Sequence, residues 1–165
     1  MTEFKLGPHQ SLITKSDIWI FDRDGDAELL EKQMIEFMLT NKGIGLAANQ
    51  VNLTKRVFVM GSYDIPGFPT PFALFNPRII ESSKEQIPDR EGCLSYPGLY
   101  LTVKRPQWVV AEYQDGRGTS REIKIDGYLS KCFQHELDHL DGVCFVDRVS
   151  RLKLNLAMKK LGKNK

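Results

Sequence analysis

The spacing of apolar residues along the chain predicts three amphipathic helices. In residues 27–41 the apolar side chains fall at positions i, i+4, i+7 and i+8, and a glycine at position 43 ends the pattern. The acidic residues of the segment 22–26 are expected to cap the start of this helix. Helical spacing recurs in residues 129–140 and in residues 150–161, where the polar positions are basic.

The middle of the chain is rich in β-branched and aromatic residues, which favours strands. Five segments are predicted as extended: residues 56–60, 72–80, 107–114, 121–125 and 143–146. An Asp-Gly turn joins 107–114 to 121–125 as an antiparallel pair. Because the strands are followed by helices and do not alternate with them, the pattern favours an α+β fold. We expect a single domain over residues 1–165, with antiparallel or mixed sheets around the helix at 129–140 and a C-terminal helix.

Four segments lack a regular apolar pattern. Residues 4–21 are predicted to be irregular, and residues 64–71 and 89–98, which contain or adjoin prolines, are predicted as loops. The glycine-rich segment 43–50 is either a tight turn or a loop facing a substrate, because glycine permits close approach of the backbone. It lacks the Gly-Lys-Ser/Thr ending of a phosphate-binding loop.

Composition limits the class of protein. The chain has 165 residues, 41% of them hydrophobic, which suits a globular domain, and no apolar run has the length of a membrane span. The net charge of +2 does not favour DNA binding. Three cysteines and no recognisable signal or transit segment indicate a reducing compartment, the cytoplasm or an organelle after removal of a leader. Cys132 and Cys144 are expected to pack in the core, whereas Cys93 lies in a glycine-flanked loop.

The strongest chemical pattern is Gln-His-Glu-Leu-Asp-His at residues 134–139. On a helix, His135 and His139 project from the same face, so two imidazoles can bind one transition-metal ion. Glu136 then lies beside the ion, where it can handle protons. The alternative is a buried helix whose histidines are only hydrogen-bonded, and the five-residue pattern favours the metal site over it.

A catalytic site of this kind needs a third protein ligand and an open position for water. The two ligands known from proteases are missing, since Phe145 stands where a third histidine would be and no glutamate follows the motif. Asp141 and Asp147 are weak alternatives. On ligand chemistry alone Cys93 is favoured over them, without excluding them.

Three separated motifs together resemble those of the peptide deformylase family. They are Gly-x-Gly-x-Ala-Ala-x-Gln at residues 43–50, Glu-Gly-Cys-x-Ser at 91–95 and Gln-His-Glu-x-Asp-His at 134–139. The resemblance extends over residues 43–150. It departs from the family at Asn49, where proline is frequent, and at Tyr96, which replaces a common aliphatic residue and could narrow the substrate groove.

The resemblance implies a metal centre and its catalytic residue. Cys93 is implied as the third ligand beside His135 and His139, and Glu136 as general base and acid. One divalent ion is implied, with Fe²⁺ native and Zn²⁺, Ni²⁺ or Co²⁺ able to substitute.

The same resemblance implies the residues that meet the substrate. Gln50 and the backbone N–H of Leu94 would donate hydrogen bonds to the developing oxyanion. Glu91 would pair with Arg105 as a structural element. Four residues would line the peptide groove and the methionine pocket: Ile44, Gly45, Tyr128 and Cys132.

The implied activity is hydrolysis of the formyl group from N-formylmethionyl nascent peptides by a metal-activated water, with release of formate. A zinc metalloprotease and a non-catalytic metal-binding domain are the alternatives. We expect a monomer that binds neither membrane nor DNA. The basic helix at the C-terminus either contacts the ribosome or is simply solvated. Its basic residues are Arg151, Lys153, Lys159, Lys160, Lys163 and Lys165.

Overall fold

The computed structural model describes residues 4–7 and 9–163. The helices are α1 (His9–Leu12), α2 (Ala27–Thr40), α3 (Gly127–Leu140) and α4 (Arg151–Lys163), with 3-10 turns at Ala48–Val51 and Phe145–Arg148. The strands are β1 (Gly45–Ala47), β2 (Val57–Met60), β3 (Phe72–Ser82), β4 (Gln86–Gly92), β5 (Tyr100–Pro106), β6 (Trp108–Gln114) and β7 (Ser120–Asp126). Within the described ranges, no helix is both long and apolar enough to span a bilayer.

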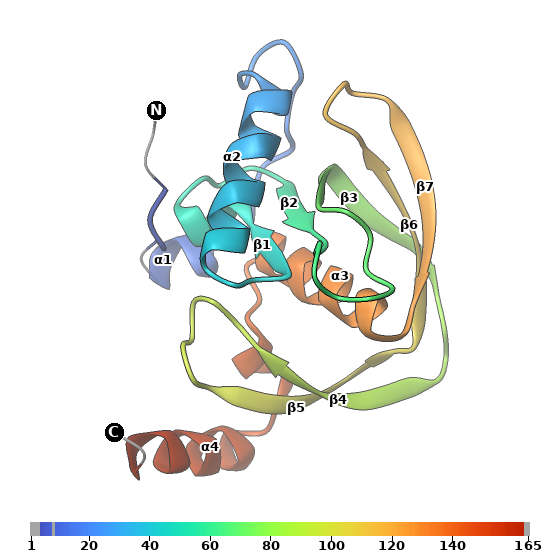
Figure 1. The fold of residues 1–165 in the computed structure, drawn as a ribbon. Coiled ribbons are helices and arrows are strands. Elements are labelled where there is room, and N and C mark those ends of the chain that lie inside the picture. Colours follow the sequence, from blue (N-terminus) through green and yellow to red (C-terminus); the bar gives the residue numbers. More distant parts are fainter. Residues whose placement is uncertain (1–3, 8, 164–165) are drawn as a thin grey trace.

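Two antiparallel sheets enclose α3 (Figure 1). The larger sheet has the strand order β1-β2-β3-β6-β7, and the smaller one is the hairpin β4-β5. Helix α2 packs on β1, β2 and β3. Helix α4 forms the C-terminal end of the described chain and lies beside β5. The arrangement confirms the predicted α+β class and the central position of the histidine helix.

The core is divided into three apolar clusters that hold α3 between the sheets. In the first, Met34 and Met38 of α2 are fully buried against the large sheet. In the second, Phe133 and Leu140 of α3 pack against the same sheet, with the ring of Phe133 5.2 Å from that of Phe58. The third cluster joins β5 to α4 through Phe145. Residues on several faces of α3 are therefore buried, which keeps its polar side chains in fixed positions.

Several predicted elements are confirmed. The helix predicted at 27–41 is α2, and Asp26 caps it by accepting a hydrogen bond from the backbone N–H of Leu29 (2.9 Å). The pair predicted at 107–114 and 121–125 is the β6–β7 hairpin, and the C-terminal helix is α4. The extended segment predicted at 72–80 is β3, which has a register shift between Phe75 and Arg78.

Other predictions were wrong. The loop predicted at 89–98 begins inside β4, and β5 was not predicted. Pro88 is tolerated because β4 has a single partner strand, so its other edge needs no N–H donor. The segment 143–146, predicted as a strand, enters a 3-10 turn. The irregular segment 4–21 contains α1, and the glycine-rich segment 43–50 contains β1.

Candidate metal centre

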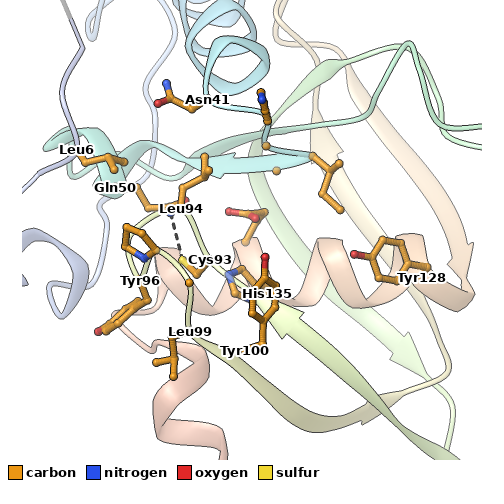
Figure 2. A pocket seen from close by; sticks show the side chains of 18 residues that line it. Leu6, Asn41, Gln50, Cys93, Leu94, Tyr96, Leu99, Tyr100, Tyr128 and His135 are labelled. Atoms are coloured by element: carbon orange, nitrogen blue, oxygen red, sulfur yellow. Dashed lines mark hydrogen bonds between the residues drawn. The ribbon is translucent and has the colours of Figure 1, made fainter. Parts of the chain in front are cut away.

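Three potential ligands from two distant parts of the chain converge beside α3. The donor atoms of Cys93, His135 and His139 all lie within 4.8 Å of one another. Sγ of Cys93 is 3.3 Å from Nε2 of His139. The two histidines stand one turn apart on α3, and Cys93 follows the end of β4, which brings the loop across the helix (Figure 2).

A network of buried charges orients the first histidine. Nδ1 of His135 donates a hydrogen bond to Oε2 of Glu91 (2.9 Å), which leaves Nε2 as the free ligand atom. Arg105 donates to both oxygens of Glu91 (2.5 and 3.0 Å), so the expected pair is present. Burial raises the pKa of Glu91, but the bonds from His135 and Arg105 outweigh burial and lower the pKa below its usual value. Glu91 is therefore a carboxylate that supports the imidazole.

The second histidine is held differently. His139 is 1% exposed, and its backbone carbonyl accepts a hydrogen bond from Nδ2 of Asn49. Burial is the main cause that lowers the pKa of His139 well below its usual value, and the charge of Arg105 lowers it further. The imidazole is therefore neutral, which is the form that binds a metal.

Glu136 lies at the same site but is not one of the three converging ligands. It is 5% exposed, and its Oε2 accepts no hydrogen bond from any residue in the described ranges. Burial raises the pKa of Glu136 to about 7, so this carboxyl can take up and release a proton near neutral pH. Gly45 faces it closely, because a Cβ at that position would lie 2.8 Å from Cδ of Glu136.

The predicted oxyanion donor also reaches the site. Oε1 of Gln50 accepts a hydrogen bond from the N–H of Ala47 (2.8 Å), which orients the side-chain amide. Nε2 of Gln50 donates to Oγ of Ser95 (3.1 Å) and lies 3.5 Å from Sγ of Cys93. Leu94 follows Cys93 on the loop and lines the open cavity that leads to the site (Figure 2).

An open cavity of about 600 Å³ gives access to these groups. Ile44, Gly45 and Tyr96 are among the residues that line it, and the ring of Tyr96 also packs on that of Phe145. A smaller pocket of about 60 Å³ adjoins it, with Ile44, Tyr128 and Cys132 among its walls. In Figure 2, Tyr128 lies at the N-terminal end of α3, away from His135. Cys132 also packs in the core, as expected, and Cys144 is buried.

The donor set fits a divalent transition-metal ion. One thiolate and two imidazoles are the ligands of catalytic tetrahedral sites that keep a fourth position open. The orphaned Oε2 of Glu136 is buried in the same site, where an exchangeable fourth ligand could meet it. The weak alternatives do not join this group, since Asp141 pairs with Arg56 and Asp147 accepts from the N–H of Cys144.

Three contributing residues carried no role in the sequence interpretation. Asp138 accepts hydrogen bonds from Arg105 (2.7 Å) and Arg148 (3.0 Å), and thereby extends the charge network from Glu91 to the turn after α3. Ser95 holds the amide of Gln50, and Asn49 holds the backbone of α3. All three lie inside the three sequence motifs, and this was the only sign in the sequence that they contribute to the site. Their hydrogen-bond partners are distant in the sequence, so their roles could not be predicted from it.

The fold is that of an α+β protein, and its site brings two histidines of one helix and one cysteine together in a group that could hold a metal ion. The family model for polypeptide deformylase matches residues 1–155. The chain therefore belongs to the polypeptide deformylase family.

Individual relatives agree with this assignment. The chain is 38% identical over 168 residues to the peptide deformylase of Wolbachia sp. subsp. Brugia malayi (strain TRS), which covers 97% of this chain and 93% of the relative. It is 46% identical over 122 residues to that of Prochlorococcus marinus (strain NATL1A), covering 73% of this chain. The crystal structure of a peptide deformylase from Synechococcus elongatus in complex with actinonin superposes with a TM-score of 0.85 at 38% identity, covering 98% of this chain and 90% of that one.

The match is incomplete for some relatives. The chain spans about 60% of the length of the peptide deformylases of Prochlorococcus marinus strains NATL1A and NATL2A.

Proposed function

We propose that the chain forms one catalytic domain that removes the formyl group from N-formylmethionyl nascent peptides and releases formate. The observation that carries the proposal is the convergence of Cys93, His135 and His139 beside the buried carboxyl of Glu136. The relatives named as peptide deformylases support it. No observation favours a protease or a non-catalytic metal domain.

Cys93, His135 and His139 would hold the ion, and we propose Fe²⁺ as the native one, with Zn²⁺, Ni²⁺ or Co²⁺ able to replace it. When bound, a divalent ion supplies a Lewis acid and lowers the pKa of water. Glu91 and Arg105 keep the first imidazole in the tautomer that ligates through Nε2.

The chain's own groups then handle the proton and the developing charge. Glu136 accepts a proton from the attacking water and returns one to the amine nitrogen of the leaving peptide, for which its raised pKa is suited. Nε2 of Gln50 and the N–H of Leu94 donate hydrogen bonds to the formyl oxygen as it becomes negative. The peptide backbone lies along Ile44 and Gly45, and the methionine side chain enters the pocket bounded by Tyr128 and Cys132.

Formate release from formyl-Met-Ala-Ser by the metal-loaded protein tests the proposal, with an unformylated protein as the second substrate. We expect formate from the first and no cleavage of the second. The Glu136→Ala protein should keep its metal and lose about 10²–10⁴ in rate. Cleavage of the unformylated protein would identify a protease instead, and absence of any turnover with metal bound would indicate a non-catalytic domain.

We also propose that α4 contacts the ribosome near the emerging substrate. Arg151, Lys153, Lys159 and Lys160 are exposed, whereas Leu154 and Leu161 pack on the third core cluster. Lys165 and the side chain of Lys163 lie outside the described residues. The Lys159→Glu/Lys160→Glu protein should sediment with ribosomes less than the unmodified protein, and the difference should shrink as salt rises. Equal sedimentation of the two proteins would show that α4 is only solvated and does not contact the ribosome.

We expect the protein to be a monomer that is located in the cytoplasm or in an organelle.

A further inference from the structure

A second large cavity lies between the β4–β5 hairpin and helix α4. Its volume is about 640 Å³, which is within the range that proteins use to bind ligands. We call this cavity the α4 groove. Its walls are formed by Arg90 of β4, by residues 98–102, and by five residues of α4, which are Lys153, Leu156, Ala157, Lys160 and Leu161.

The α4 groove meets the open cavity that leads to the metal centre. Gly98, Leu99 and Tyr100 line both cavities. Figure 2 shows Leu99 and Tyr100 on the side of Cys93 that faces away from Asn41. In the proposed function the formyl end of the peptide lies at the metal ligands, so the rest of the chain must leave the open cavity. A peptide that leaves over Tyr100 enters the α4 groove directly.

The ring of Tyr100 is held in place at this shared rim. The guanidinium group of Arg90 lies 4.3 Å from the centroid of the ring, which is a cation–π contact. Gly92 approaches from β4, where a Cβ would lie 2.8 Å from Cε1 of the ring. Tyr100 is nevertheless 53% exposed. It therefore presents a fixed aromatic surface between the two cavities, on which a peptide can rest.

The α4 groove carries positive charge. Arg90, Lys153 and Lys160 are exposed, and none of the described residues that line the groove is acidic. Leu156 lies between the two lysines in the sequence and is 52% exposed. The groove therefore offers cations on both sides of an apolar side chain, a combination that suits a peptide with acidic residues on both sides of an apolar one.

The spacing of the two lysines matches an extended peptide. Lys153 and Lys160 are seven residues apart on α4, so they stand on nearly the same face and about 10.5 Å apart along the helix axis. In a polyproline II conformation, residues i and i+3 point to the same side and are about 9 Å apart. Two acidic residues three positions apart can therefore each meet one lysine, while an apolar residue between them contacts Leu156.

We propose that the α4 groove receives the part of the nascent peptide that extends beyond the open cavity, and that it favours acidic residues in this part. The inference rests on the proposed function, which identifies where the formyl end of the peptide lies. The bound segment touches none of the reacting groups. The groove therefore lowers KM for longer acidic substrates and leaves kcat unchanged.

The test compares two octapeptide amides that differ only in charge, formyl-Met-Ala-Ser-Gly-Glu-Leu-Ala-Glu and formyl-Met-Ala-Ser-Gly-Lys-Leu-Ala-Lys. At about 20 mM salt the metal-loaded protein should favour the acidic peptide about tenfold in kcat/KM, through KM alone. The preference should shrink to about twofold at roughly 0.5 M salt. No ribosome is present, so the result does not depend on the other proposed role of α4.

Two variants of the lysines test the groove itself. Lys153→Glu/Lys160→Glu should reverse the preference, and Lys153→Gln/Lys160→Gln should bring the two octapeptides within about twofold. Both variants should hydrolyse the short peptide formyl-Met-Ala-Ser at the normal rate. Lys32→Glu/Lys84→Glu is the matched control, because it changes the net charge equally at exposed residues outside the groove, and it should keep the preference.

Equal kcat/KM values for the two octapeptides in the unmodified protein would overturn the proposal. So would a preference that persists unchanged in the glutamine variant. Loss of the preference in the control variant would also overturn it, because the net charge of the protein and not the groove would then be responsible. If a thermal melt shows that the variant with two glutamates is unfolded, the glutamine variant decides alone.

Equilibrium binding separates this proposal from the proposed function. If the unmodified, metal-loaded protein releases no formate from any peptide, the deformylase proposal fails. Calorimetry with the N-acetyl forms of the two octapeptides still measures the groove. The Kd ratio should show the same tenfold preference, which Lys153→Gln/Lys160→Gln should remove. Equal Kd values for the two peptides in the unmodified protein would reject the groove as a site for acidic segments.

Discussion

Replacing Gly45 by alanine moves the carboxyl group of Glu136 without altering its chemistry. The backbone of Gly45 is not left-handed, so alanine adds no backbone strain. Its Cβ would, however, lie 2.8 Å from Cδ and 2.9 Å from Cγ of Glu136. Ordinary contact begins near 3.4 Å, and Oε1 of Glu136 lies closer still to this Cβ than Cδ does, so the carboxyl group must retreat by roughly 1 Å. A misplacement of that size can cost about 10²-fold in rate. We therefore expect kcat for formyl-Met-Ala-Ser to fall about 10²-fold.

The assay must distinguish a displaced base from a damaged metal site. We expect the Gly45→Ala protein to bind one metal ion per chain, as measured by atomic absorption, while kcat falls. Gly162→Ala is the matched control, because a Cβ on this residue of α4 meets no described atom within 4 Å. It should keep its kcat and gain up to about 1 kcal/mol in stability. A kcat within threefold of normal in the metal-loaded Gly45→Ala protein would refute the inferred contact. Loss of the metal would show instead that the substitution lowers kcat by disturbing the metal ligands.

Three further substitutions test separate parts of the site. Cys93→Ala should abolish stoichiometric metal binding, and unchanged metal content by atomic absorption would remove Cys93 from the ligand set. Gln50→Ala should lose about 10²–10³ in kcat, as for other oxyanion donors, whereas a change confined to KM would contradict that role. Arg105→Met should lower the free energy of unfolding in urea by about 3–5 kcal/mol, because Glu91 and Asp138 are then buried without this partner. A loss below 1 kcal/mol would show that the network does not stabilise the fold.

The sequence predicted the helices well and the β4–β5 hairpin poorly, for a physical reason. Leu101 and Val103 of β5 alternate as expected for a half-buried strand, but the third buried position is Arg105. On β4 the inward positions include Asp89 and Glu91. Both strands direct polar groups towards α3, so the apolar alternation that predicts a strand is cut short where the hairpin supports the metal site.

The same contrast holds for the site. Helical spacing alone places His135, Glu136 and His139 on neighbouring positions of one helix. Nothing in that spacing could select Cys93, because its place depends on how a hairpin 42 residues earlier in the sequence crosses α3. Ligand chemistry favoured Cys93 over the aspartates that follow α3 without excluding them, and only the three separated motifs singled it out.

Two hydrogen bonds between α3 and β4 make the orientation of a proposed metal ligand depend on one interface. Glu91 orients His135, while Asp89, two residues away on the strand, tethers Lys131. A shift of β4 along α3 would break both bonds together and would disturb the imidazole, since both bonds span the same two elements. Arg105 opposes such a shift because it binds Glu91 on β4 and Asp138 on α3 at once. The buried charges between the sheets thus have a positional role that an apolar core of equal volume could not supply.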